Sequence, residues 1–327
     1  MSLSFVPLLS GLVAFILSLV AGPRTIAFLR RFKLGQQIRG DGPKSHLGKA
    51  GTPTMGGILM VVTIVVAVIV FPPVTHNNVL MLFATIGFGV VGFLDDFIKI
   101  VAKRSLGLRA REKLVGQFGV AFLVALYASS RVGTDLLVPF WGQTIVLPTL
   151  VYIPFSTIVL VGAANAVNIT DGIDGLAAGS TAISAAAIGL LCYFLGYPDL
   201  SLFFGAVAGA CLGFTWFNGP PAQVFMGDTG SLALGAALGT GAILSKTSLV
   251  LPILGGLFVI ETLSVIIQVL YFKLTKGKRF FKMAPLHHHF ELGGISEITV
   301  TIRFWIVGIV LAILAVSSLN VYSIIIS

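Results

Sequence analysis

The feature that most constrains this chain is a series of long apolar runs separated by polar links. Ten runs approach the length of roughly 20 residues that an apolar helix needs to cross a bilayer. Hydrophobic residues make up 56% of the chain and charged residues only 10%, against roughly 25% charged residues in soluble domains. The sequence therefore predicts an all-α polytopic membrane protein with ten transmembrane helices. The runs cover residues 3–28, 54–71, 79–98, 114–131, 149–167, 176–195, 201–217, 230–245, 249–273 and 303–325.

The basic residues indicate how these helices are oriented. Eighteen of the 21 lysines and arginines fall in 30–49, 99–113 and 273–303, which all lie on one face of a ten-helix arrangement. The positive-inside rule makes this face cytoplasmic, and an even number of spans places both termini in the periplasm. The net charge of +9 thus largely reflects orientation and does not indicate a nucleic-acid partner. The link 132–148, rich in β-branched and aromatic residues, predicts a small periplasmic β-hairpin.

Two adjacent carboxylates, Asp95 and Asp96, stand where the third predicted helix ends. A helix C-terminus disfavours negative charge, and neighbouring carboxylates repel each other unless a cation lies nearby. Lys99 and Lys103 follow Asp95 at steps of four residues, so one helical face carries a carboxylate and two lysines. A solvated helix end is the alternative interpretation, but ionisable residues at membrane depth usually serve a function. We therefore expect a divalent cation or a phosphate-binding lysine pair here.

Further polar clusters fall in other links of the same predicted face. NITDGIDG could be a plain turn, and Asp228 in GDTGS could simply cap the helix that follows. Because Mg²⁺ takes oxygen ligands and often retains substrate phosphates, three aspartate clusters on one face favour a magnesium site instead. The histidines of MAPLHHHFE lack the further ligands of a tetrahedral metal site, so phosphate binding or proton handling fits them better. The clustered residues are Lys49, Thr54, Asn168, Asp171, Asp174, Asp228, His287, His288 and His289.

Acidic residues for Mg²⁺ and cationic residues for phosphate, set at a membrane surface, indicate phosphoryl transfer onto a membrane lipid. In such chemistry the protein mainly positions groups and neutralises charge. A Walker A motif is absent from the sequence, which argues against a standard ATPase. A proton-coupled transporter is a second class to consider. Transporters usually place such groups near the bilayer midplane, often with internal repeats, and neither feature is visible in this sequence.

Five segments of the chain resemble a known family. GTPTMGG, FLDDFIK, NAVNITDGIDGLA, VFMGDTGSLALG and MAPLHHHFE resemble the signature loops of the phospho-N-acetylmuramoyl-pentapeptide transferases. That family is a branch of the polyprenyl-phosphate N-acetylhexosamine-1-phosphate transferases. The match runs in order from about residue 41 to residue 305. A sibling transferase that uses UDP-GlcNAc is the nearest alternative, and the histidine loop argues against it.

The resemblance implies what the chain does and where. It implies an enzyme of the bacterial inner (cytoplasmic) membrane, usually a homodimer, with residues 1–327 as one domain and five cytoplasmic loops forming the active site. The enzyme would move phospho-MurNAc-pentapeptide from UDP-MurNAc-pentapeptide to undecaprenyl phosphate, giving lipid I and UMP, with Mg²⁺ required. This is the first membrane step of peptidoglycan synthesis, which supports cell shape and division.

The resemblance also implies roles for individual residues. Asp95, with Asp96 beside it, becomes the base that deprotonates the lipid phosphate. Phe225 becomes a stacking surface for uracil. The implied catalytic residues are Asp95, Asp96, Asp228 and His287, and the implied metal ligands are Asp228 and Asp171. The implied substrate-binding residues are Lys49, Thr54, Lys99, Lys113, Asn168, Asp171, Asp174, Phe225, His288 and His289.

The ninth run carries a carboxylate near its middle. As a straight helix, residues 249–272 would rise about 36 Å, more than the roughly 30 Å of hydrocarbon. Gly255 and Gly256 precede Glu261, and glycine pairs are recognised sites of sharp kinks. We predict a bent or broken helix with Glu261 turned into the bundle. We also predict an apolar cleft beside it, through which a polyprenyl tail could reach Asp95.

Overall fold

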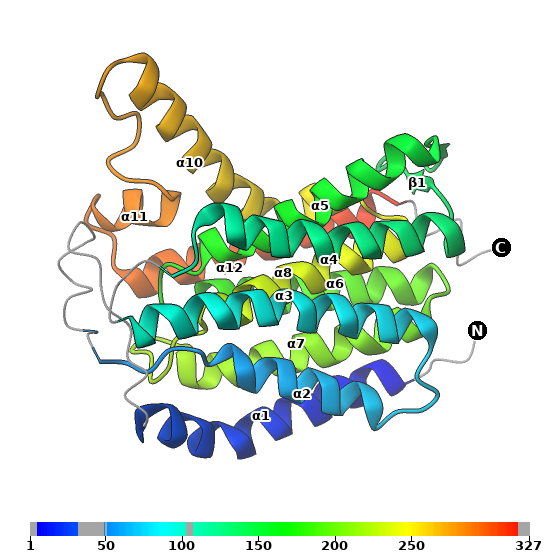
Figure 1. The fold of residues 1–327 in the computed structure, drawn as a ribbon, viewed down its shortest axis with the longest axis horizontal. Coiled ribbons are helices and arrows are strands. Elements are labelled where there is room, and N and C mark those ends of the chain that lie inside the picture. Colours follow the sequence, from blue (N-terminus) through cyan, green and yellow to red (C-terminus); the bar gives the residue numbers. More distant parts are fainter. Residues whose placement is uncertain (1–4, 32–48, 50, 103–106, 320–327) are drawn as a thin grey trace.

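The computed structural model describes residues 5–31, 49, 51–102 and 107–319, and these are mostly helical (Figure 1). Lys103 and most of PKSHLGKAG, which the sequence analysis singled out, lie outside the described residues. The long helices run roughly side by side in one bundle. In chain order the helices are α1 (Val6–Arg31), α2 (Gly57–Ile69), α3 (His76–Val101), α4 (Ala110–Arg131), α5 (Thr149–Thr170), α6 (Leu176–Phe194), α7 (Pro198–Asn218), α8 (Gly227–Leu244), α9 (Leu251–Leu254), α10 (Gly256–Leu274), α11 (Leu286–Glu291) and α12 (Glu297–Ser317).

Each predicted apolar run coincides with a helix, and eight helices of the described chain are long and apolar enough to cross a membrane. Two runs fall short of that measure. Helix α2 has 13 residues, which gives a rise of about 20 Å and leaves it shorter than the hydrocarbon layer. Helix α8 has 18 residues, but its glycines and hydroxyl side chains make it less apolar than those eight helices. The structure therefore supports a multi-pass membrane protein without fixing the number of spans at ten.

Helix α8 lies at the centre of the bundle because its sequence is built from small residues. Its GDTGSLALGAALGTGAIL segment lets neighbouring backbones come close, as small residues do in membrane helix packing. A Cβ added to Gly57 of α2 would collide with the backbone of Gly230, and one added to Gly92 of α3 would collide with that of Asp228. This close packing brings the first turn of α8 against α2 and α3. Asp228 lies in that turn.

The ninth run is broken, as predicted. Helix α9 ends at Leu254 and α10 begins at Gly256, from where α10 projects away from the bundle (Figure 1). Glu261 on α10 is fully buried, so it faces protein rather than lipid. The predicted apolar cleft is also present beside the break. It lies between α5, α8, α9 and α10, and is lined by residues such as Ala163, Leu238 and Phe258.

The predicted hairpin forms at the end of the bundle opposite α11 (Figure 1). Strand β1 (Asp135–Leu137) pairs antiparallel with β2 (Thr144–Val146), with Leu136 opposite Ile145. The hairpin is fixed to the loop after α8, because Leu137 donates its backbone N–H to the carbonyl of Lys246 at 2.8 Å. The Lys246 ammonium also contacts Asp135 at 2.8 Å. A hydrogen bond and an ion pair therefore hold the hairpin to the end of α8.

Candidate active site

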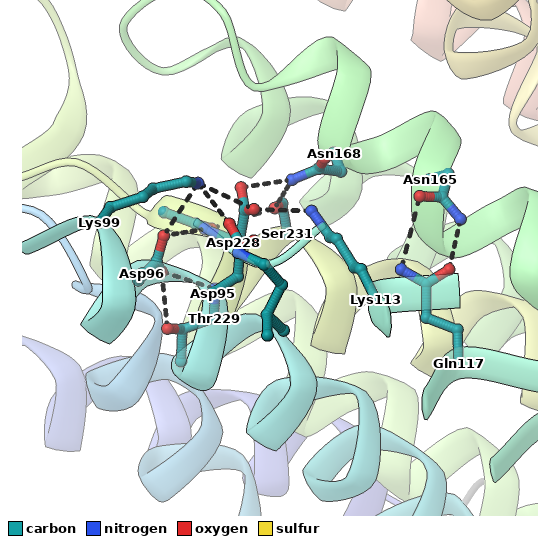
Figure 2. A network of polar contacts seen from close by, with 12 residues as sticks. Asp95, Asp96, Lys99, Lys113, Gln117, Asn165, Asn168, Asp228, Thr229 and Ser231 are labelled. Carbon is teal, nitrogen blue, oxygen red and sulfur yellow. Dashed lines mark hydrogen bonds and ion pairs between the residues drawn. The ribbon is translucent and has the colours of Figure 1, made fainter. Parts of the chain in front are cut away.

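Polar side chains from three helices converge on Asp228, which lies at the start of a fourth helix, α8 (Figure 2). Its Oδ2 contacts the ammonium of Lys113 at 2.6 Å and that of Lys99 at 3.0 Å. Its Oδ1 accepts a hydrogen bond from Asn168 Nδ2 at 2.9 Å. The same amide group donates to Ser231 at 2.8 Å, a partner that the sequence analysis did not single out. With Asp95 and Asp96, these residues form what we call the Asp228 cluster: Asp95, Asp96, Lys99, Lys113, Asn168 and Asp228.

Asp96 holds the first turn of α8 in place. Its Oδ1 accepts from the backbone N–H of Asp228 at 3.2 Å, and its Oδ2 accepts from both the N–H and the hydroxyl of Thr229, at 2.9 and 2.8 Å. Helix N-terminal N–H groups lack intrahelical partners, so a carboxylate from α3 supplies the cap that the sequence analysis had considered for Asp228 itself. Gly227 has a φ of 72°, and a Cβ there would lie 2.6 Å from Asp96 Oδ2 and 3.0 Å from Thr54 Oγ1. Thr54 is thereby placed beside the cluster.

Asp95 and Asp96 are both buried, and the ammonium group of Lys99 offsets the repulsion between their carboxylates. Lys99 lies 2.6 Å from Asp95 Oδ2 and 3.6 Å from Asp96 Oδ1. The other oxygen of Asp95 accepts from the backbone N–H of Leu108 at 2.9 Å. The i,i+4 spacing read from the sequence therefore corresponds to an ion pair within one helix.

The carboxylates of the Asp228 cluster fit a hard divalent cation. Asp95, Asp96 and Asp228 each offer one oxygen within 4.8 Å of the others. Against these three carboxylates stand two lysines, so the formal charge of the cluster is about −1 at neutral pH. An all-oxygen donor set of this charge suits Mg²⁺ better than a soft metal.

Asp171, the other expected metal ligand, is not one of the three grouped carboxylates. It follows the last residue of α5 and is partly buried. Burial raises the pKa of Asp171 to about 8, and the nearby negative charges of Asp228, Asp96 and Asp174 add to the shift. A cation bound close by would oppose that shift, because it favours the ionised carboxylate.

Lys49 and Asp174 belong to a second group, which we call the Lys49 cluster: Lys49, Asp174 and Glu297. The Lys49 ammonium lies 2.8 Å from Asp174 Oδ1 and 2.5 Å from Glu297 Oε1. Asp174 also accepts from the backbone N–H of Ala222 at 2.9 Å, and its own N–H donates to Glu297 at 2.8 Å. Glu297 was missed by the sequence analysis. Glu297 lies in the first turn of α12, where an acidic residue is common because it interacts favourably with the helix dipole, so its sequence position gave no sign of a further role.

The three histidines take three different partners. His287 is fully buried and its Nδ1 lies 3.1 Å from Glu261 Oε2. His288 Nδ1 pairs with Glu291 at 2.7 Å, and His289 Nδ1 accepts from the backbone N–H of Lys282 at 3.1 Å. The His287 ring lies against Gly172, in the loop after α5.

Glu261 and Gly172 enclose the His287 ring. Glu261 accepts from the backbone N–H groups of Leu286 and His287, at 2.9 and 3.2 Å, so one buried carboxylate holds both the start of α11 and the ring. His287 Nε2 has no partner among the described residues, and any Cβ on Gly172 would collide with it. The mid-span glutamate is therefore paired, and its partner is the histidine loop.

Phe225 and Thr54 lie on two loops that pair with each other. Phe225 donates its N–H to the carbonyl of Pro53 at 2.8 Å and accepts from the N–H of Gly56 at 2.9 Å. This pairing joins the GTPTMGG and VFMGDTGS segments next to the Asp228 cluster. The Phe225 side chain stays partly exposed, as a stacking surface requires.

The comparisons with known proteins agree with this architecture. The family model of glycosyl transferase family 4 matches residues 78–246, which span α3 to α8 and contain the whole Asp228 cluster. The chain thus falls in a class of membrane-embedded transferases. A phospho-N-acetylmuramoyl-pentapeptide-transferase signature also matches residues 49–61, the segment that carries Lys49 and Thr54.

Curated relatives narrow the class to one family. The phospho-N-acetylmuramoyl-pentapeptide-transferase of Thermoanaerobacter sp. (strain X514) is 49% identical over 96% of this chain and 98% of its own length. That of Bacillus subtilis (strain 168) is 50% identical, over 93% and 95%. The chain belongs to the phospho-N-acetylmuramoyl-pentapeptide-transferase family, and it is accordingly a phosphotransferase.

Proposed function

We propose that this enzyme transfers phospho-MurNAc-pentapeptide from UDP-MurNAc-pentapeptide to undecaprenyl phosphate, with lipid I and UMP as products. The observation that carries the proposal is the Asp228 cluster, where three carboxylates and two lysines meet at one end of the helix bundle. The names of the curated relatives and the matched signature support the muramoyl substrate.

The substrates and products define which bonds change. An oxygen of the lipid phosphate forms a bond to the β-phosphorus of the nucleotide, and the bond from that phosphorus to the bridging oxygen breaks. The α-phosphate then leaves as part of UMP. Since negative charge shifts onto the leaving phosphate, fixed cations stabilise the transition state. We assign this role to Lys99 and Lys113, whose ammonium groups already converge on Asp228.

The carboxylates take separate roles in the proposal. Asp95 is the base for the lipid phosphate. Asp96 acts through Asp228, because its hydrogen bonds fix the first turn of α8. Asp228 would hold Mg²⁺, with oxygens of Asp95 and Asp96 within 4.8 Å of its own. Asp171 would lie at the nucleotide side. When bound, the ion would neutralise charge on the pyrophosphate.

The remaining expected residues are proposed to line the substrate pocket. Phe225 would stack on uracil, with its partly exposed ring as support. Asn168 would lie at the pyrophosphate end, since its amide already reaches Asp228. His287, which is buried beside the loop after α5, would be a catalytic residue. The other pocket residues of the proposal are Lys49, Thr54, Asp174, His288 and His289.

We further infer a multi-pass protein of the bacterial inner membrane, with residues 1–327 as one domain. In this arrangement ten helices cross the bilayer, both termini are periplasmic, and five cytoplasmic loops build the active site. The charge distribution supports it, because 18 of 21 lysines and arginines fall in the links of one face. The resemblance leads us to propose a homodimer as well.

The apolar cleft beside the α9–α10 break is the proposed route of the lipid chain. Its lining is almost entirely apolar, and most of the lining residues belong to α5 and α10. A polyprenyl tail could lie there with its phosphate directed toward Asp95.

A radiolabelled transfer assay tests the proposed function. Purified enzyme with undecaprenyl phosphate should form labelled lipid I from UDP-MurNAc-pentapeptide and release UMP. Omitting Mg²⁺ should abolish transfer and restoring it should recover transfer. The matched control replaces the donor with UDP-GlcNAc, which should give no product. Transfer from UDP-GlcNAc alone would contradict the proposal and assign the enzyme to the sibling activity.

Cysteine labelling tests the orientation. Both native cysteines are buried, so introduced cysteines can be read against a low background. Gln143→Cys in the hairpin and Lys278→Cys after α10 replace exposed residues at opposite ends of the bundle. An impermeant reagent added to intact cells should label the first and not the second. Labelling of both from outside would contradict the proposed topology.

A further inference from the structure

A pair of amide side chains joins α4 and α5 inside the bundle. Asn165 Nδ2 donates to Gln117 Oε1 at 2.6 Å, and Gln117 Nε2 returns a longer hydrogen bond to Asn165 Oδ1 at 3.5 Å. Asn165 Nδ2 also donates to the carbonyl of Val161, one turn back on its own helix, at 2.8 Å. Gln117 is fully buried. Neither residue takes part in the Asp228 cluster.

The pair lies one turn deeper than two members of that cluster (Figure 2). Gln117 follows Lys113 by four residues on α4, and Asn165 precedes Asn168 by three residues on α5. At a rise of 1.5 Å per residue, each amide lies about 5 Å below its neighbour in the cluster. Lys113 and Asn168 both contact the Asp228 carboxylate, at 2.6 and 2.9 Å. The two helices are thus joined at two levels.

An amide pair does something here that apolar side chains would not. In a bilayer no hydrophobic driving force holds helices together, and apolar faces can slide past one another at little cost. A two-way amide pair is directional, so it favours one rotation and one longitudinal position of each helix. Single buried polar residues are known to specify helix register in this manner.

We propose that Gln117 and Asn165 are a positioning pair that fixes the register of α4 against α5, so that Lys113 and Asn168 meet Asp228 together. A slip of one residue would move Lys113 by about 1.5 Å along the helix axis, which would break its contact with Asp228. Misplacements of about 1 Å can reduce turnover by about 100-fold. The link to turnover rests on the proposed function, whereas the register itself does not.

The decisive variant keeps side-chain volume and removes hydrogen bonding. Gln117→Met with Asn165→Leu gives an apolar pair of similar size, which should keep the helices packed. The swapped variant, Gln117→Asn with Asn165→Gln, restores an amide on each helix. Thr157→Ala is the matched control on α5, because its hydroxyl bonds only within its own helix, to Ile153. The kcat and KM for transfer and the melting temperature in detergent are measured for each.

We expect the variant with the apolar pair to have a melting temperature within a few degrees of the wild type. Its kcat should fall about 10- to 100-fold. The KM values should change by less than about threefold, the swapped pair should recover a large part of kcat, and Thr157→Ala should keep it. Each single variant should lose about as much kcat as the double variant, because either change breaks the same pair.

Three results would overturn the proposal. The first is an apolar pair with kcat within about twofold of the wild type. The second is a loss of kcat that follows the loss of folded protein across all variants. The third is a swapped pair no better than the apolar one. Wild-type enzyme without any transfer would instead contradict the proposed function, which keeps the two failures distinct.

Discussion

Asp228 and Asp174, one carboxylate from each cluster, are held in different ways. Asp228 receives its hydrogen bonds and ion pairs from side chains: Lys99, Lys113 and Asn168. Asp174 also has one side-chain partner, Lys49, but its Oδ2 accepts from the backbone N–H of Ala222. Its own N–H and carbonyl are bonded as well, to Glu297 and Thr301. Side-chain partners can turn toward a ligand, whereas backbone partners cannot leave without moving a loop. The comparison separates an aspartate that can exchange partners from one that holds the loops together.

The largest expected effect is on Asp228. Asp228→Asn keeps the size of the side chain but removes the charge that Lys99 and Lys113 share. Turnover should fall by roughly two orders of magnitude or more, the scale of a lost electrostatic group. The melting temperature should stay near that of the wild type. The measurement is the lipid I transfer assay beside thermal unfolding in detergent, with Asp135→Asn as the matched control. Near-normal turnover would remove Asp228 from the metal site.

Asp174→Asn should reduce stability more than turnover, the reverse of Asp228→Asn. An asparagine retains one acceptor oxygen, so either the Lys49 ammonium or the Ala222 N–H loses its full partner. We expect the free energy of unfolding to fall by about 1–3 kcal/mol. The kcat of the protein that remains folded should fall by less than about tenfold. If Asp174→Asn were as stable as the wild type and as inactive as Asp228→Asn, these two aspartates would not differ in the proposed way.

Glu261→Gln tests how the histidine loop depends on its buried carboxylate. The carboxylate accepts from two backbone N–H groups and contacts His287 Nδ1. A glutamine offers only one acceptor oxygen, so the loop should loosen and turnover should fall by about tenfold. Proteolysis between α10 and α12 should become faster. Unchanged proteolysis together with unchanged turnover would show that the loop does not need this carboxylate.

The smallest effect is expected at the hairpin. Asp135→Asn removes the partly exposed ion pair with Lys246, worth about 0–1 kcal/mol, and should leave turnover unchanged. The hydrogen bond to Asp135 raises the pKa of Lys246 above its ordinary value. A raised lysine pKa stabilises the fold below about pH 10.4, and this contribution is lost as pH rises through the folded-state value. The difference in melting temperature between wild type and variant should therefore be constant from about pH 7 to 9 and shrink only above about pH 10.

The sequence by itself determined where the helices run. A backbone inside hydrocarbon must satisfy its own hydrogen bonds, so each long apolar run had to become a helix. The β-branched and aromatic residues of 132–148 predicted the hairpin, and the glycine pair predicted the break near Gly255. The resemblance in five loops predicted the family, which the comparisons confirm.

Only the tertiary structure decided which polar groups meet. Asp96 caps α8 across 133 residues, Asp174 meets Glu297 across 123, and Gln117 meets Asn165 across 48. A periodic pattern reports which face of a helix is apolar, but it does not report which other helix lies against that face. The partners of His287 and Asp228 depend on the close packing around α8. That packing is set by small residues on several helices at once, so no single segment encodes it.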